Sequence, residues 1–512
     1  MQNAAQVSAD TLRLIKEAQG NPSAALLKAY TQAASATSGI TAYDLEAPAK
    51  LLFPVITPLR NVIPRVSGKG GIQANWRAVT GVNSARYSLG LVEGRRGGIS
   101  TDTTADYTAV YKEMGLDQTV SFKAERAAEG FQDLDELAVA NLLKAVMIGE
   151  EFCDLAGNTS LALGTTANAV LTQANTGGSL LEDTSYGVGV VALTADGYYR
   201  ASLTGGVVQT YTRTNGDGTT DTCNGGTAIA STQANVTTAN VSGTANTHVI
   251  NATVTAKAGA FAYAWFWGVA SGNLTLGAIT TINSVQITAT ATGNAAPASP
   301  GIGNFNALAA TDYSQDSRIY DGLLTMCSNS SLNSYRVVQA TGNAGTGTPL
   351  TSDGAGGITE FDTALQSFWD NYRLGPDTIW VSSQEMKYLR RHVLTGATAA
   401  AQRFVFQVDQ AGVVGGVSVK SYLNPFTMGG PAEIPIRLHP NVPPGTVLFT
   451  SQQLPYPMSN VTNVMQKRLR QDYFQINWPI TTRVRGFGVY FDGVLQHYFP
   501  PSMGIITNIG AG

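Results

Sequence analysis

The sequence predicts an α+β protein that carries an inserted all-β sandwich. A helical pattern occupies residues 129–157, after which the composition changes abruptly. From Asn158 to about Ala310 the chain is rich in Thr, Ala, Gly and Asn and almost free of charge. Mixed helical and extended patterns return from Asp312. Because 512 residues exceed what one hydrophobic core usually organises, we expect about two or three domains.

Residues 1–66 are predicted to form an N-terminal arm and a strap. A weak helical pattern over residues 8–36 is interrupted at Gly20-Asn21-Pro22. Between Ala47 and Arg65 four prolines interrupt an apolar stretch, and each favours extended backbone at the residue before it. We therefore expect an extended strap that lies along another surface.

Residues 67–125 are predicted to form a long two-stranded hairpin, the extended loop. Ile72 to Val79 and Asp106 to Met114 alternate between apolar and polar residues, and the Gly/Arg-rich stretch between them has little to bury. A hairpin of two strands is only marginally stable alone in water. This one therefore needs a partner surface.

Four basic residues of the hairpin segment are the candidate assembly contacts: Lys69, Arg86, Arg95 and Arg96. A cluster of three arginines at the tip could bind nucleic acid. However, Tyr87 is the single aromatic residue between them, whereas a stacking platform for bases interleaves several. We favour ion pairs between subunits, for which the guanidinium group is well suited.

Residues 126–160 are predicted to contain the longest helix of the chain. The apolar residues over 129–157 recur at helical spacing: Phe131, Leu134, Ala138, Leu142, Val146 and Phe152. At 1.5 Å per residue such a helix is about 40 Å long. Acidic residues near its start suit the helix dipole, and Gly157-Asn158 provides a plausible end.

Residues 161–305 are predicted to form the inserted sandwich. Turn signals at Asp196-Gly197 and Asn215-Gly216-Asp217-Gly218 separate its strands, and a Gly/Ala/Pro linker over 292–301 closes it. The alternating segments are Tyr186 to Leu193, Gly206 to Arg213, His248 to Lys257, Ala260 to Trp267 and Ser284 to Thr292. The most apolar run, Phe261 to Ala270, is too short to cross a membrane, so we interpret it as sandwich core.

Residues 306–450 are predicted to form a compact αβα domain. One helical face carries Phe361, Leu365, Phe368 and Tyr372, and Asp377 to Val381 has the pattern of a strand. Ser382 and Glu385 form a capping box that opens a helix to about Leu394.

Residues 451–512 are predicted to be strands that return to the domain of the long helix. The stretch from Arg468 to His497 is divided by Pro479 and by a turn predicted at Asp492-Gly493. Strands that come last in the chain must find their partners in earlier segments.

No catalytic, cofactor-binding or metal site is predicted. The four histidines are scattered without ligand spacing, and the three cysteines form neither a metal pattern nor a disulfide framework. Gly354-Ala355-Gly356-Gly357 lacks the Lys-Ser/Thr of a phosphate-binding loop, and no serine stands in a nucleophile elbow. We expect a protein that is not an enzyme and uses no cofactor.

The charge content indicates extensive uncharged or covered surface. Hydrophobic residues make up 43% of the chain and charged residues only 13%, about half the usual charged share. A formal net charge of -3 provides no large basic field, which disfavours sequence-specific DNA binding. The first residues lack the pattern of a secretory signal, so we expect no export by that route and no membrane anchor.

Five segments, in this order, carry a resemblance to a known family: TPLRNVIPRVSG (57–68), the helix 129–157, SRIYDGLLTM (317–326), DTIWVSSQEMKYLRR (377–391) and TTRVRGFGVYFDGVLQHYFPPSMGIITNIG (481–510). They resemble the HK97-like fold of tailed-bacteriophage major capsid proteins over roughly 1–160 and 306–512. The resemblance implies an N-terminal arm, an extended loop, a peripheral domain with a spine helix, and an axial domain. The insert (SYGVGVVALTADGYY, AFAYAWFWGVASG) resembles immunoglobulin-like or fibronectin-type domains.

The resemblance implies a subunit that self-assembles into hexamers and pentamers of an icosahedral phage head around a dsDNA genome. The implied partners are further copies of the chain, a scaffolding protein, a portal and a decoration protein, with non-specific contact to DNA. The implied location is the virion, assembled in the host cytoplasm. Some shells of the family join a loop lysine to a neighbour's asparagine. Lys69 is the nearest candidate here, but we favour an ordinary surface lysine and predict no crosslink.

The alternative function is a surface or tail adhesin whose sandwich binds a host glycan or cell surface. The missing export signal and the central position of the sandwich disfavour it, because an adhesin normally presents its binding domains in series. Electron microscopy separates the two, since only the first function produces shells, tubes or capsomers.

Overall fold

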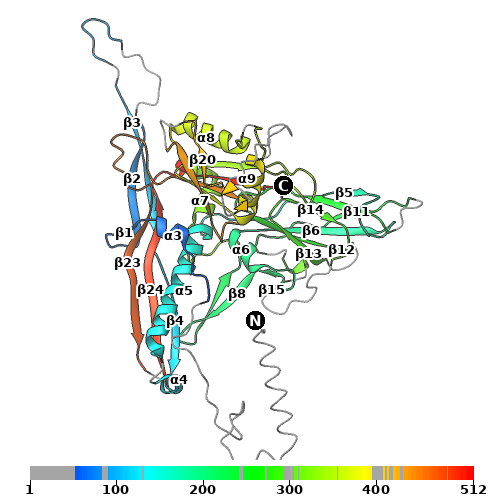
Figure 1. Cartoon of the computed structure of the whole chain (residues 1–512), viewed down its shortest axis with the longest axis horizontal. Coiled ribbons are helices and arrows are strands. Elements are labelled where there is room, and N and C mark those ends of the chain that lie inside the picture. Colours follow the sequence, from blue (N-terminus) through cyan, green and yellow to red (C-terminus); the bar gives the residue numbers. More distant parts are fainter. Residues whose placement is uncertain are drawn as a thin grey trace, which may run out of the picture. The chain divides into compact units, whose positions relative to one another are not determined.

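The computed structural model has a mixed α+β fold (Figure 1). The residues that it describes are 52–82, 90–97, 99–129, 132–241, 246–270, 274–291, 301–302, 305–308, 311–354, 356–394, 408–409, 412–413, 419–426, 431–480 and 482–511. The helical arm predicted over 8–36, most of the 292–301 linker and Arg86 lie outside these residues.

Strands far apart in the sequence form the first sheet (Figure 1). Its order is β1 (Arg65–Ser67), β23 (Met465–Trp478), β24 (Val484–His497) and β4 (Lys112–Ser121). β1 runs parallel to β23, and the other two pairings are antiparallel. The prediction that late strands pair with early segments is confirmed, because β23 and β24 lie between β1 and β4.

The turn predicted at Asp492-Gly493 is wrong, since both residues lie inside β24. Gly493 instead allows the Leu469 side chain of β23 to pack closely against β24. A Cβ there would lie 2.6 Å from the Leu469 side chain, nearer than any real Cβ contact. Asp492 is buried and forms an ion pair with Arg470 of β23. The Asp-Gly pair therefore marks a crowded position between two long strands.

The long helix α5 spans Leu134–Ala156, and a separate short helix, α4 (Phe122–Ala128), precedes it. The predicted start at residue 129 is therefore wrong by five residues. The sequence between the two helices contains Gly130, a weak helix former. The predicted stop is confirmed: α5 ends before Gly157, where a Cβ would lie 2.2 Å from the carbonyl oxygen of Tyr320.

The predicted hairpin is confirmed as β2 (Gln73–Val82) and β3 (Asp102–Val110), which form a two-stranded sheet of their own. Its second strand was placed too late in the sequence. β3 begins at Asp102, whereas residues 112–114 belong to β4 and pair with β24. Tyr111 separates β3 from β4. The extended chain therefore pairs with β2 before Tyr111 and with β24 after it.

The strap predicted over Ala47–Arg65 is in part wrong. Pro58 opens a short helix, α3 (Pro58–Val62), a position that suits its fixed backbone angle and missing N–H. Leu59 and Ile63 are buried in the chain's own core. This part of the strap therefore lies on its own subunit and not on another surface.

The insert has two sheets that share one core (Figure 1). One has the order β10 (Ala234–Thr237), β6 (Ser185–Leu193), β12 (Ala262–Val269) and β13 (Thr275–Thr280). The other has the order β14 (Ser284–Ile287), β11 (Val249–Thr253) and β5 (Val170–Ala174). Trp265 of β12 and Ile250 of β11 both belong to the shared core and are fully buried.

The central strands β6 and β12 are buried on both faces. Phe266 points away from the shared core into a second cluster with Phe305 and Leu308 of the short helix η1 (Phe305–Leu308). A Cβ at Gly189 of β6 would lie 2.3 Å from the Phe305 ring, so glycine makes room for that ring. The run from Ala262 to Trp267 is core, as predicted, whereas Val269 is 50% exposed and Phe261 belongs to a different core cluster.

Smaller elements complete the insert: α6 (Ala195–Arg200), the β8 (Thr210–Thr214) and β9 (Thr220–Asn224) hairpin, and β7 (Val207–Val208) paired with β15 (Gly301–Ile302). The turn predicted at Asp196-Gly197 is wrong, because both residues lie in α6. The Thr194 side chain caps this helix by accepting from the Gly197 N–H at 3.1 Å. The turn predicted at residues 215–218 is confirmed between β8 and β9.

The third sheet has six strands in the order β16 (Tyr335–Val338), β25 (Gly504–Thr507), β22 (Val447–Thr450), β17 (Thr378–Val381), β21 (Glu433–Leu438) and β20 (Ser421–Leu423). Residues 451–512, expected to return to one domain, are thus divided between two sheets, because β25 lies here. The other short elements are α7 (Leu323–Ser328), η2 (Ser330–Leu332), β18 (Val408–Asp409), β19 (Gly412–Val413) and η5 (Pro500–Ser502).

Helices α8 (Thr359–Tyr372) and α9 (Ser383–Leu394) accompany this sheet, as predicted. Phe361 and Phe368 of α8 pack edge to face against Phe449 of β22. The opposite face of the sheet, with Trp380 and Leu448, belongs to the core that also contains Leu155 of α5. The alternation of side chains along a strand therefore makes this sheet a layer between two cores.

Two buried asparagines join the insert to the end of β25. Asn508 accepts the Asn283 N–H at 2.7 Å and donates to the Asn283 side chain at 3.0 Å and to the Gln339 carbonyl at 2.7 Å. Asn508 has a φ of 64°, a left-handed conformation that Asn tolerates better than most residues.

We predict that Asn508→Ala lowers the free energy of unfolding by about 2–3 kcal/mol, because it leaves buried groups unpaired and strains the backbone. Asn508→Gly is the matched control, since glycine accepts the positive φ but supplies no amide. Urea unfolding of both variants should show a smaller loss for glycine. A loss under about 0.5 kcal/mol in both variants would contradict the assignment.

Candidate functional site

The β2/β3 hairpin exposes apolar side chains that the described part of the chain leaves uncovered. Val79 and Val82 of β2 are 62% and 68% exposed, and Ile72 at its base is 77% exposed. Val110 of β3 is also exposed. Exposed β-branched side chains on a two-stranded ribbon are typical of a surface that packs against another surface.

Side-chain pairs across the two strands hold the hairpin together. Trp76 stacks on Tyr107, directly opposite, with ring centroids 5.8 Å apart. Arg77 forms a two-pronged ion pair with Asp106, with Nε–Oδ1 and Nη2–Oδ2 distances of 2.6 and 2.8 Å. The hydrogen bonds between them raise the pKa of Arg77 and lower that of Asp106. Both side chains are exposed, so solvent screens this pair.

The predicted contact residues lie at the two ends of the hairpin. Lys69 is exposed near its base. Arg95 and Arg96 are exposed at its tip, where the Arg95 N–H donates to the Val92 carbonyl at 3.0 Å and Gly94 has a φ of +78°. Within the described ranges neither arginine forms an ion pair. Their role in assembly, like that of Arg86, stays a prediction.

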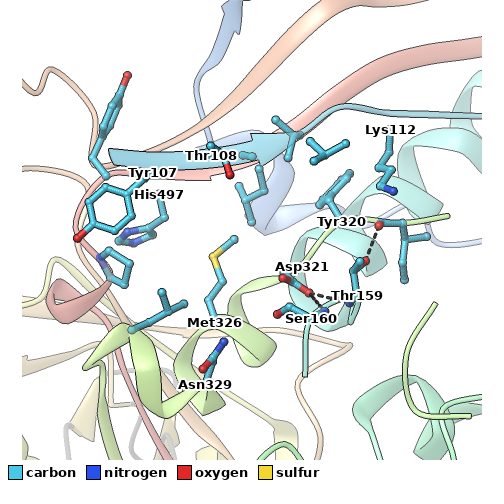
Figure 2. A pocket seen from close by; sticks show the side chains of 18 of the residues that line it. Tyr107, Thr108, Lys112, Thr159, Ser160, Tyr320, Asp321, Met326, Asn329 and His497 are labelled. Carbon is cyan, nitrogen blue, oxygen red and sulfur yellow. Dashed lines mark hydrogen bonds between the residues drawn. The ribbon is translucent and has the colours of Figure 1, made fainter. Parts of the chain in front are cut away.

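The base of the hairpin is anchored beside a cavity of about 350 Å³ (Figure 2). Trp76 meets Tyr498 edge to face at 5.8 Å, and both line the cavity. Figure 2 shows Met326 between His497 and Asp321. The Asp321 carboxylate accepts hydrogen bonds from the Thr159 and Ser160 N–H groups at 2.7 and 3.0 Å. The hairpin is therefore fixed at one end, while beyond Trp76 its strands are largely exposed, with Val79 and Val82 left uncovered by the residues that the structure describes.

His497, at the end of β24, lies in this cavity wall as a buried side chain. Its Nδ1 has no hydrogen-bond partner among the described residues. Burial lowers the pKa of His497 to about 3, because the charged ring would lose its hydration. The folded protein therefore holds this histidine neutral.

A second site lies where α5 meets the strap and β23. Glu150, Glu151 and Asp154 of α5 are all buried carboxylates. They face three cations, Arg60, Arg65 and Lys467, together with Tyr320, Tyr473 and His439. We call this set the buried ionic junction. Its three acids and three basic side chains balance in formal charge.

Glu150 connects three segments of the chain. Arg65 Nη1 of β1 lies 2.8 Å and Arg60 Nε of α3 lies 3.1 Å from its carboxylate oxygens. Lys467 Nζ of β23 lies at 3.3 Å, and the Tyr473 hydroxyl donates to the same carboxylate. Burial alone would raise the pKa of Glu150, but Lys467, Tyr473 and Arg65 outweigh it and hold that pKa below its usual value.

Glu151 and Asp154 complete the junction. Glu151 accepts the Leu59 and Arg60 N–H groups at the start of α3, at 2.9 and 2.6 Å, and its Oε1 lies 2.6 Å from His439 Nε2. Asp154 pairs with Lys467 and accepts the Tyr320 hydroxyl at 2.7 Å. Burial raises the pKa of Asp154 to about 6 against the opposing effect of Lys467.

The sequence prediction missed this junction. The signal was present: Glu150, Glu151 and Asp154 crowd the end of a helix that otherwise buries apolar residues. Acids on a buried helical face require cations, but the basic partners lie about 90 positions before and 313 positions after them. Sequence spacing alone does not identify such partners.

The acids Glu150 and Asp154 of the junction are paired with basic side chains of the chain itself. Across the described part of the chain, no group of three or more His, Cys, Asp or Glu side chains is placed to hold a metal ion. Among the helices of that part, none is long and apolar enough to cross a membrane.

Comparisons with known proteins find similar solved structures only. No family model matches the chain, and no curated protein matches it. The capsid of a native GTA particle matches 94% of this chain and 100% of its own, with 10% identity and a TM-score of 0.41. A structure of Mycobacterium phage Bobi matches 92% and 95%, with 11% identity and a TM-score of 0.36. The capsid of Myoviridae phage XM1 matches 91% and 95%, with 9% identity and a TM-score of 0.39. Because these scores and identities are low, function has to be argued from the chain's own geometry.

His497 should make stability depend on pH. Its folded pKa lies below the unfolded value of 6.5, so its contribution is present above about pH 6.5 and is lost as the pH falls toward 3. Between pH 7 and pH 5 this amounts to about 2 kcal/mol. We predict that His497→Leu removes this part of the difference, measured by urea unfolding at both pH values. An unchanged pH dependence in the variant would exclude His497 as its source.

Lys467→Met should destabilise the fold by about 3–5 kcal/mol, because it leaves Asp154 and Glu150 buried without their shared cation. Arg213→Ala is the matched control, since Arg213 forms an exposed ion pair with Asp221 and its loss should cost about 1 kcal/mol or less. Thermal and urea unfolding of both variants measure the difference. Equal losses in the two variants would show that the junction contributes no more than a surface pair.

Proposed function

We propose that this chain is a shell-forming subunit, the major capsid protein of a tailed bacteriophage with an HK97-like fold. The observation that carries the proposal is the β2/β3 hairpin, anchored at one end and exposed along its apolar residues. In this proposal further copies of the chain cover it, assembled as hexamers and pentamers of an icosahedral head that encloses dsDNA.

Energetics support a partner for the hairpin. Fully burying a Val or Ile side chain contributes about 1.5–3 kcal/mol; Ile72, Val79 and Val82 are mostly exposed and Val110 is about half exposed. A two-stranded ribbon has little stability of its own. Covering its exposed side chains with an adjoining subunit therefore stabilises the ribbon and the contact together.

The rest of the chain supplies a firm body for such contacts. We assign α5 with the sheet of β23 and β24 to a peripheral domain, the six-stranded sheet to an axial domain, and the insert to an immunoglobulin-like decoration. The low charged fraction of 13% suits broad contacts between subunits, because few ions must be desolvated. Domain rotations about these contacts would allow shell expansion.

The charged residues of the hairpin have specific roles in this proposal. Arg86, Arg95 and Arg96 form ion pairs with acidic groups of neighbouring copies, and Lys69 is a surface lysine that forms no crosslink. A scaffolding protein, a portal and a decoration protein are further proposed partners, and DNA contact is non-specific. The proposed location is the virion, after assembly in the host cytoplasm.

The adhesin alternative has less support. It needs a binding face on the insert, and aromatic residues are common on faces that bind sugars or proteins. Trp265 and Trp267 of the insert are instead buried in its core. The exposed hairpin would also have no role in a monomeric adhesin.

Shortening the hairpin tests the proposal. Replacing residues 78–105 by Asn-Gly joins Arg77 to its opposite partner Asp106 through a two-residue turn. We expect the shortened chain to keep the thermal stability of the full chain but to form no shells, tubes or capsomers by electron microscopy and sedimentation.

A milder variant, Val79→Thr with Val82→Thr, keeps the hairpin and removes part of its apolar surface. It should assemble only at higher protein concentration than the unmodified chain. If the shortened chain assembles as readily as the full chain, the hairpin is not the contact that builds the shell.

A further inference from the structure

A groove of about 680 Å³ lies between the β8–β9 turn of the insert and the end of the first sheet that is remote from the hairpin. Asp117 of β4, Trp478 of β23 and Tyr490 of β24 form one side of it. Asn215 and Asp217 of the turn form the other side. Its volume lies within the range of about 300–1,000 Å³ that is usual for pockets.

The groove combines aromatic rings with carboxylates. Tyr490 and Trp478 donate to Asp117 Oδ1 at 2.5 and 3.2 Å, which fixes this carboxylate between two rings. Asp217 is exposed, and its Oδ1 accepts from the N–H and the hydroxyl group of Thr219 in its own turn. Burial raises the pKa of Tyr490, and so do the hydrogen bond to Asp117 and the charges of Asp117 and Glu113.

Two basic side chains near the groove, Arg213 and Arg318, already have partners within the chain. Arg213 forms an ion pair with Asp221 at 2.8 Å, and Arg318 donates to Cys223 and to the Thr222 carbonyl. Asp117 and Asp217 therefore leave negative charge for an incoming cation. A planar guanidinium suits such a place, because it binds carboxylates and stacks on aromatic rings.

Two exposed guanidinium groups of this chain fit that chemistry. Arg95 and Arg96 stand side by side at the hairpin tip, and in the described residues no carboxylate pairs with either. Opposite charge at the tip and in the groove would guide two copies together and fix their register.

The same chain does not bring its own tip to its own groove. The hairpin base meets Tyr498, just beyond the His497 end of β24, whereas the groove lies at the Val484 and Gly486 end. From Gly486 to His497 the strand rises about 35 Å, at about 3.3 Å per residue. A second copy must therefore supply the arginines.

We propose that the groove formed by Asp117, Asp217, Trp478 and Tyr490 receives Arg95 and Arg96 from the hairpin tip of a second copy of this chain. The inference rests on the proposed function and assigns to the insert, through Asp217, a part in the contact between subunits. The insert is then a lattice contact as well as a decoration.

Charge reversal tests the contact in the full chain. We expect Arg95→Glu with Arg96→Glu to raise the protein concentration needed for assembly at least about tenfold, because like charges then meet in the groove. Adding Asp217→Arg to that variant should restore assembly in large part. The matched control, Lys420→Glu with Arg437→Glu, changes the net charge equally at two exposed cations, one just before β20 and one in β21, and should assemble as the unmodified chain does.

The outcomes separate the two proposals. If the unmodified chain forms no assemblies, the proposed function fails, and this contact fails with it. If the unmodified chain assembles and reversal at Arg95 and Arg96 has no effect, or has the same effect as the control pair, the groove contact alone is overturned. Rescue by Asp217→Arg supports the contact, because a general effect of charge would not depend on that position.

Discussion

Three carboxylates on one buried end of α5 hold the body of this protein together. Glu150 forms an ion pair with Arg65 of β1, and Glu151 accepts a hydrogen bond from the Leu59 N–H of α3, both early in the chain. Asp154 forms an ion pair with Lys467 of β23, which comes late. Each of these charges is costly to bury alone, so the three segments are stable in this arrangement only together. The junction therefore fixes which early segment meets which late strand.

The hairpin is formed by the chain segment between β1 and β4, which the buried ionic junction does not hold. With β1, β23, β24 and β4 joined in one sheet, the chain between β1 and β4 must leave the body and return. Trp76, which contacts Tyr107 and Tyr498, anchors the hairpin to the body, and beyond it, among the described strands, β2 and β3 pair with each other alone. In the proposed function, neighbouring copies of the chain would cover this ribbon.

The insert is built differently, from packing and not from charge. Its central strands are buried on both faces, with Trp265 in one cluster and Phe266 in the other. Glycine positions make the close contacts possible, as Gly189 does for the Phe305 ring. Few charges are needed because the hydrophobic effect holds the two sheets. The insert is joined to the six-stranded sheet through Asn283 and Asn508.

Local patterns by themselves determined much of this protein. The α5 stop at Gly157, the α8 and α9 helices, the hairpin and the strands β6, β12 and β17 follow from periodicity and capping, which act within a few residues. Only the tertiary structure decided what depends on distant partners. Asp492-Gly493 and Asp196-Gly197 have the composition of turns. In the structure the first pair lies inside the long strand β24 and the second inside the capped helix α6. The partners of Glu150 and the groove at Asp117 come from remote segments, because ion pairs and cavities depend on distance in space and not on distance along the chain.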